Sequence, residues 1–208
     1  MLKEKTSLRN FRDKFTEAFI FGSGPTSFDY DVELPKISDP VFFINNTHRL
    51  SHLCRSEHQY FFTHHIHKFL QVDPVTIFIQ RMFNECGESY KGVLNSVVTP
   101  INKYISVDAQ QDDEVASEWF LESFKLRDKD EIERKNRLLA CFGSATTAIH
   151  FAWFTGCKKV TFVGCNPDLD TDDYDPRISS GKMLFEPKKV KENNRVLPKM
   201  LGLNVVHR

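Results

Sequence analysis

Short runs of consecutive apolar residues, separated by polar stretches, recur along this chain. They lie at residues 17–21, 41–45, 59–63, 75–79 and 159–163. Consecutive rather than alternating apolar positions indicate strands that are buried on both faces, which is typical of parallel sheets covered by helices. The pattern therefore predicts five strands of such a sheet, and residues 203–207 predict a closing strand.

The segments between these runs predict the helical part of the fold. Their lengths leave room for short helical crossovers. A helix is expected from Ser144 or Thr146 to about Phe154, with Gly156 as its stop. Alternating strands and helices favour an α/β fold with a Rossmann-like, doubly wound and mainly parallel sheet. We expect a single domain over residues 1–208, in which the more polar residues 82–136 form a peripheral insertion or small subdomain.

The amino-acid composition argues against some classes of protein. The 28 Lys and Arg residues balance the 28 Asp and Glu residues, so the chain lacks the positive field of a dedicated nucleic-acid binder. The 19 Phe residues predict a large aromatic core. No apolar stretch is long enough to cross a bilayer and no secretory signal is present, so we expect a cytoplasmic protein without integral membrane contact. The five Cys residues form no CxxC pair, which favours reduced thiols over a zinc site.

In open α/β sheets, ligands bind beyond the carboxyl ends of the strands. The first strand is followed by Gly22, Ser23, Gly24, Pro25 and Thr26. Glycine lets a ligand approach the backbone closely, and backbone N–H groups at such a turn can bind phosphate oxygens. The segment is neither a Walker loop nor a complete dinucleotide-binding fingerprint. An ordinary strand-end turn explains it equally well.

Uncharged polar groups occur at two further positions of this kind. Asn45 and Asn46 follow the second strand and offer amides that suit a ribose, a base edge or a sugar hydroxyl, although a turn or a helix cap is the commoner use of Asn. Gly143, Ser144 and Thr146 begin the predicted helix. Free N–H groups and the helix dipole favour an anion there, with simple N-capping as the alternative.

Candidate acid/base and metal-binding groups follow other strands. His64 and His65 come directly after the third strand, where a histidine can act as a catalytic acid or base. Their spacing does not suit one helical face, so we expect no metal site there. Asn166 follows the strand at 159–163 and opens an acidic loop at residues 166–175. This loop is either solvated or forms a Mg²⁺ bridge to a nucleotide diphosphate.

Three segments of the chain resemble one known family. They are residues 21–26 (FGSGPT), 43–46 (FINN) and 143–166, which begins with GSATT and ends with VGCN. In this order they resemble bacterial sialyltransferases of glycosyltransferase family 42. They also resemble the wider relatives of that family, the motility accessory factor proteins and the MptE-like hydroxymethylpterin pyrophosphokinases. The likeness covers about half of the chain.

The resemblance implies a Rossmann-like domain that binds a nucleotide-activated sugar, which is CMP-sialic acid in the sialyltransferases, and a glycan or small-molecule hydroxyl acceptor. It implies that the glycine turn and Asn45 hold phosphate and ribose, and that the Ser/Thr helix start holds a carboxylate or phosphate. It also implies that no cofactor is required. The strand-end Asp of the wider group is Asn166 here, and the only histidine after that strand is His207. The general base would then be His64, His65 or an Asp of the acidic loop.

Three functions therefore stay open. The first is a nucleotide-sugar-dependent, sialyltransferase-like glycosyltransferase with a CMP-sugar donor. The second is a Mg-dependent pyrophosphokinase of the MptE-like kind, in which the acidic loop holds Mg²⁺ with ATP. The third is a non-catalytic nucleotide-binding α/β protein whose glycine turn is structural. The acceptor and the presence of an oligomer are open in each case.

Overall fold

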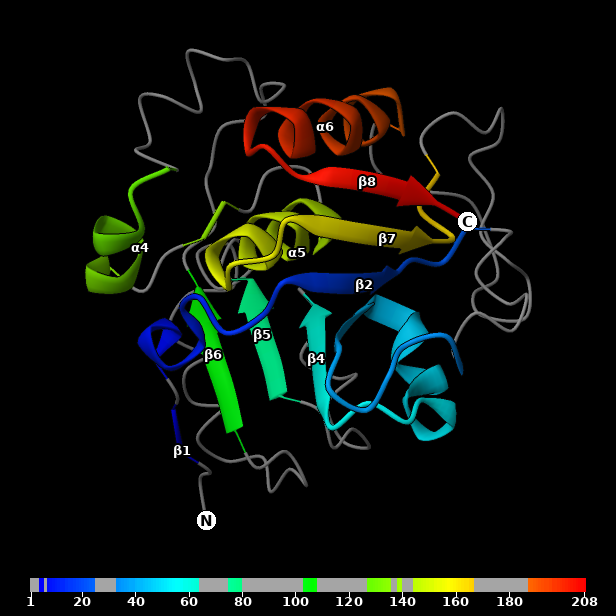
Figure 1. Cartoon of the computed structure of the whole chain (residues 1–208), viewed down its shortest axis with the longest axis horizontal. Coiled ribbons are helices and arrows are strands. Elements are labelled where there is room, and N and C mark those ends of the chain that lie inside the picture. The colour runs from blue at the N-terminus through cyan, green and yellow to red at the C-terminus, as the bar shows by residue number, and fades with distance from the viewer. Residues whose placement is uncertain are drawn as a thin grey trace, which may run out of the picture.

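The computed structural model describes residues 4–5, 7–24, 33–63, 75–79, 103–107, 127–135, 138–139, 144–166 and 187–208. Their strands are β1 (Glu4–Lys5), β2 (Glu17–Phe21), β3 (Pro40–Ile44), β4 (His58–Thr63), β5 (Val75–Ile79), β6 (Lys103–Val107), β7 (Lys159–Val163) and β8 (Asn204–His207). Their helices are the 3₁₀ helices η1 (Leu8–Phe11) and η3 (Asn45–Leu53) and the α-helices α4 (Lys129–Lys135), α5 (Ser144–Phe154) and α6 (Pro187–Met200), shown in Figure 1.

The described strands form one sheet of eight strands in the order β1-β6-β5-β4-β3-β2-β7-β8, and every neighbouring pair is parallel. The predicted Rossmann-like α/β class is thus confirmed, and each predicted strand lies in this sheet. The sequence pattern does not predict β1 or β6. Strand β6 lies inside residues 82–136, the segment expected to form a peripheral insertion or small subdomain, and it pairs with β5 in the main sheet.

The strand order reverses between β2 and β7. From β2 the chain continues outward through β3, β4, β5 and β6, and it then returns to β7 on the other side of β2. Phe21, the last residue of β2, is level with Phe43 of β3 and with Val163, the last residue of β7. The segments that follow these three strands therefore begin at one edge of the sheet, where doubly wound folds bind their ligands.

Both faces of the central strands are buried. On one face, Phe42 and Tyr60 pack against α5, and the ring centroid of Phe42 lies 5.4 Å from that of Phe151 in this helix. On the opposite face, Phe21 and Phe43 are fully buried and their ring centroids lie 5.6 Å apart. Because neighbouring side chains of a strand point to opposite faces, burial of both faces requires consecutive apolar residues. This explains the runs in the sequence.

Helix α5 is the central helix of the described core. Every side chain from Thr146 to Ala152 is buried, and the helix packs on β2, β3, β4 and α6 (Figure 1). At its end, the Gly156 N–H donates to the Trp153 carbonyl and the Cys157 N–H donates to the Ala152 carbonyl, both at 3.0 Å. Gly156 has a φ of +98°, which glycine adopts without steric strain. The predicted helix stop is confirmed.

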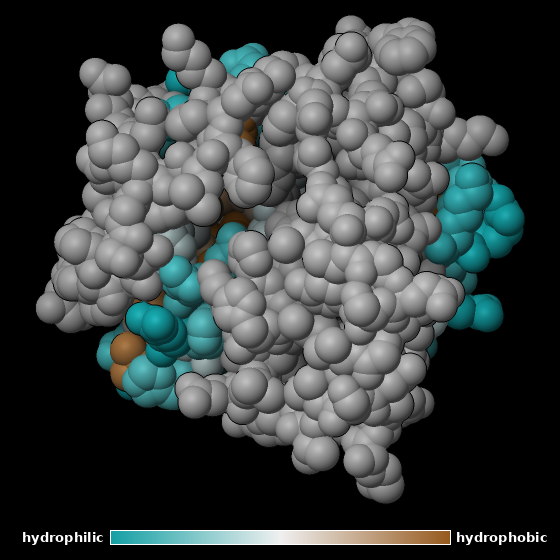
Figure 2. Space-filling model, turned by 180° about the vertical axis from the view of Figure 1, so that it is seen from behind, coloured by the Kyte–Doolittle hydropathy of each residue, from teal (hydrophilic) through white to brown (hydrophobic). Residues whose placement is uncertain are grey.

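The described surface is mainly polar. Seen from behind in Figure 2, its visible parts are mostly hydrophilic, and the hydrophobic atoms show in a recess and at one corner. The large hydrophobic side chains exposed in the described part are Leu34, Ile37 and Leu53. None of the helices in the described ranges combines the length and the apolar composition needed to cross a membrane.

Candidate functional site

The glycine turn after β2 packs directly on the segment after β7. The Gly22 N–H donates to the Val163 carbonyl at 2.8 Å, and the Gly24 N–H donates to the Gly164 carbonyl at 2.9 Å. A Cβ atom on Gly24 would lie 2.5 Å from the Gly164 oxygen, so this approach requires glycine. The N–H groups of Gly22 and Gly24, which we expect to bind phosphate, are therefore already bonded to the backbone. A ligand at this turn must use other groups, such as those of Ser23.

Thr47 ties the end of β3 to the end of β2. Its buried hydroxyl accepts the Ile44 N–H at 2.8 Å and lies 2.9 Å from the Phe21 carbonyl oxygen, to which it donates. Thr47 is the third residue of the 3₁₀ helix η3, which begins at Asn45. Its hydroxyl therefore joins the ends of two neighbouring strands, β2 and β3.

Asn45 begins η3 in an unusual backbone conformation. Its φ is +52°, in the left-handed region that few residues other than glycine adopt. Its Oδ1 lies 3.4 Å from the Ser144 Oγ, which donates to it. No residue in the described ranges accepts a hydrogen bond from the Asn45 Nδ2, so this group can still donate two hydrogen bonds to a ligand. Asn46, the next residue, is half-buried.

The start of α5 has the features of an anion site. Its first N–H groups have no intrahelical acceptor, and the positive end of the helix dipole lies there. No acidic residue occupies this first turn. The hydroxyls of Thr146 and Thr147 are buried and have no hydrogen-bond partner within the described part of the chain. Buried hydroxyls are costly to leave unbonded.

The structure brings two of the predicted groups together. Asn45 and Ser144 are 99 positions apart in the chain, yet their side chains bond to each other. The two segments meet because parallel strands end at one sheet edge and α5 begins there. Asn166 follows β7 at this edge and is half-buried.

Some predicted site residues lie outside the described residues. They are Pro25, Thr26, His64, His65 and Gly143, and residues 167–175 of the acidic loop also lie outside the described ranges. The acid/base and Mg²⁺ hypotheses therefore stay predictions. Within the described ranges, no three His, Cys, Asp or Glu side chains gather as metal ligands would.

Sequence reasoning missed His48. Its Nδ1 lies 2.7 Å from the backbone oxygen of Asn45, and its ring centroid lies 4.9 Å from that of Phe61. The signal was present in the sequence, because residue i+3 of a helical turn faces residue i. A histidine three positions after a strand-end Asn is placed to contact it.

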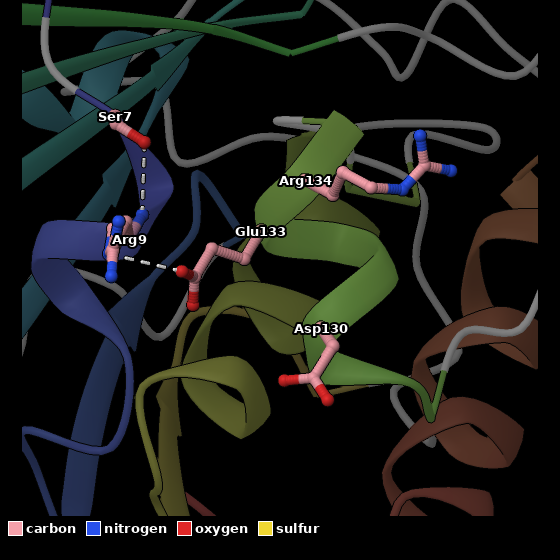
Figure 3. A pocket seen from close by; sticks show the side chains of 5 residues that line it. All are labelled: Ser7, Arg9, Asp130, Glu133 and Arg134. Carbon is pink, nitrogen blue, oxygen red and sulfur yellow. Dashed lines mark hydrogen bonds and ion pairs between the residues drawn. The ribbon is translucent and has the colours of Figure 1, made fainter.

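A separate hollow of about 400 Å³ lies between η1 and α4. Glu133 points toward Arg9 of η1, to which it is paired at 3.3 Å, while Arg134 points away (Figure 3). Arg12 bonds to Asp130 at 2.5 Å and to Glu133 at 3.2 Å. Figure 1 shows α4 far from the carboxyl ends of β2 and β7. Because its carboxylates are paired with arginines, this hollow is best explained as the ionic contact that attaches α4. Its lining residues are Ser7, Arg9, Asp130, Glu133 and Arg134.

Comparison with solved structures finds similarity to sialyltransferases from Campylobacter jejuni. The sialyltransferase CstII, solved in complex with the substrate analogue cytidine-5'-monophosphate, is 11% identical over 93% of this chain and 80% of that chain, with a TM-score of 0.43. The monofunctional alpha-2,3-sialyltransferase Cst-I is 13% identical over 93% of this chain and 75% of that chain, with a TM-score of 0.43. No family model and no curated protein matches the chain. Similarities this low assign the chain to no family.

Proposed function

We propose that this chain is a nucleotide-sugar-dependent glycosyltransferase of the sialyltransferase kind. It binds a CMP-sugar donor beyond the carboxyl ends of β2, β3 and β7 and transfers the sugar to a hydroxyl acceptor. The observation that carries the proposal is the contact of Asn45 with Ser144, in the same helical turn as two buried hydroxyls that lack partners among the described residues. The resemblance of residues 21–26, 43–46 and 143–166 to bacterial sialyltransferases is the reason for choosing a CMP-sugar.

Each group has a task in this proposal. The first turn of α5 holds the donor's phosphate or carboxylate through backbone N–H groups and the helix dipole. The Asn45 Nδ2 donates to an acceptor atom of the ribose or base. Thr146 and Thr147 gain the hydrogen-bond partner that they lack in the described structure. These groups are held in place before the reaction, so their N–H and O–H dipoles stabilise the negative charge that develops on the leaving phosphate.

The transfer step needs one proton acceptor. The acceptor oxygen forms a bond to the anomeric carbon while the bond from that carbon to the phosphate oxygen breaks. The acceptor's proton goes to a base, for which we propose His64 or His65, and CMP leaves as an anion at the start of α5. The step balances without a metal ion, so we propose that no cofactor is required.

Binding can be tested before any acceptor is known. Isothermal titration with CMP and a thermal-shift series with CMP, UMP and ATP, each with and without Mg²⁺, should show CMP binding that is independent of Mg²⁺. A ligand at 100 times its Kd stabilises a protein by about 2.7 kcal/mol, which a thermal shift detects readily. The absence of a shift with every nucleotide would remove the proposal. Mg²⁺-dependent binding of ATP alone would favour the pyrophosphokinase instead.

Two substitutions test the location of the site. Asn45→Gly keeps the left-handed backbone while removing the amide, and Ser144→Ala removes the hydroxyl that orients it. Each should weaken CMP affinity about tenfold, the typical effect of losing one well-oriented hydrogen bond. Ser7→Ala is the matched control, because this serine caps η1 through the Arg9 N–H and lies outside the proposed site. Its CMP affinity should equal that of the wild type.

A further inference from the structure

His48 lies three residues after Asn45 in η3 and is half-buried. Its Nδ1 lies 2.7 Å from the backbone oxygen of Asn45. A carbonyl oxygen only accepts hydrogen bonds, so the Nδ1 must carry a proton and donate it. One ring nitrogen of His48 is therefore committed to the backbone of Asn45.

The conformation of Asn45 needs such support. A φ of +52° is sterically unfavourable for a residue with a Cβ atom, even though Asn tolerates it better than most. The peptide before Asn45 is held by Thr47, whose hydroxyl lies 3.0 Å from the Ile44 carbonyl oxygen, within hydrogen-bond distance. The carbonyl after it is held by His48. Hydrogen bonds on both sides thus hold the backbone that directs the Asn45 amide toward Ser144.

The ring of His48 is itself oriented by packing. Its centroid lies 4.9 Å from that of Phe61, with an angle of 48° between the two planes. Phe61 is fully buried in β4 and is level with Phe43 of β3. A ring that rests on a fixed neighbour loses little additional freedom when it forms a hydrogen bond. His48 is therefore a preorganised donor to Asn45.

We infer that His48 is a positioning residue of the nucleotide site. Through its Nδ1–H it holds Asn45 in the left-handed conformation in which the amide faces the ligand. The identity of the ligand rests on the proposed function, whereas the bond from His48 to Asn45 does not.

Two substitutions distinguish the roles of the two ring nitrogens of His48. In His48→Asn the side-chain amide nitrogen takes the place of Nδ1 and can still donate to Asn45, whereas in His48→Gln it takes the place of Nε2 and cannot. We expect His48→Gln to weaken CMP affinity about tenfold, and His48→Asn to stay within about threefold of the wild type. Circular dichroism and thermal unfolding establish that both variants fold. An equal loss in the two variants would overturn the inference.

A double-mutant cycle then tests whether His48 acts through Asn45. In the Asn45→Gly background, His48→Gln should cause no further loss of CMP affinity, because the amide that it positions is gone. Additive losses would show that His48 acts by another route. If the wild type binds none of the nucleotides, the proposed function fails, and ¹⁵N spectra of labelled histidine still test the bond. A protonated Nδ1 on His48 at neutral pH supports the inference, and an unprotonated Nδ1 contradicts it.

Discussion

A buried hydroxyl without a partner lowers stability, and α5 carries a hydroxyl at Thr146 that has no partner among the described residues. Thr146→Val replaces this hydroxyl with a methyl group of similar shape. We expect the ligand-free variant to be more stable than the wild type by about 1 kcal/mol, because an unsatisfied polar atom is removed from the core. We expect its CMP affinity to fall, because the same hydroxyl faces the proposed ligand. Urea unfolding and titration calorimetry measure the two effects.

The control for this residue is Thr155→Val. Thr155 is also fully buried, but its hydroxyl donates to the Ala152 carbonyl at 2.9 Å. Valine should therefore destabilise the protein at this position, by about 1 kcal/mol, without changing CMP affinity. Stabilisation by both substitutions would mean that valine itself, rather than the missing partner of Thr146, is responsible.

At the scale of elements, the sequence predicts the strands and helix ends that depend only on residues close together in the chain. The inner strands were predictable because burial of both faces requires consecutive apolar residues, and the end of α5 was predictable from Gly156. Strand β1 has only two residues, and β6 lies in a polar segment, so neither shows a run of this kind. The contact between Asn45 and Ser144 depends on which strands are neighbours, and the pattern of apolar residues does not encode that order.

Helices α5 and α6 are each followed by a glycine with a positive φ, and these two glycines can be compared directly. Gly156 has a φ of +98°, and a Cβ atom there would lie 2.9 Å from the Phe15 carbonyl oxygen. Gly202 has a φ of +68°, and nothing lies within 4 Å of the position of its Cβ. Gly202→Ala should cost only the backbone strain of about 1–2 kcal/mol. Gly156→Ala should cost clearly more, since it adds a contact with the backbone. Equal unfolding free energies of the two variants would contradict this explanation.

At the scale of the whole molecule, one core supports the candidate site. The sheet, α5 and α6 pack into a continuous cluster, so the start of α5 is fixed relative to the ends of β2, β3 and β7. The hollow between η1 and α4 lies far from these strand ends, where its paired charges attach a helix whose only buried residue is Ile132. The proposed binding site and the peripheral attachment of α4 are thus separated in the fold. A ligand at the strand ends should raise the stability of the core as a unit.

The same core contains a thiol that reports on global unfolding. Burial raises the pKa of Cys157 to about 11, from an ordinary value of 9.0. Folding therefore favours the protonated thiol, and its contribution to stability is complete below pH 9 and is lost as the pH rises toward 11.

Between pH 7.5 and 10.5 the wild type should lose about 2 kcal/mol more of its unfolding free energy than Cys157→Ala, which has no thiol to titrate. Urea unfolding at both pH values measures this difference. Tyr60 is retained in both proteins, and burial, the main cause of its raised pKa, acts in both; the smaller contribution from the charge of Cys157 is lost in Cys157→Ala and is part of the measured difference. Parallel losses in the two proteins would mean that the Cys157 thiol titrates normally and is not enclosed by the core.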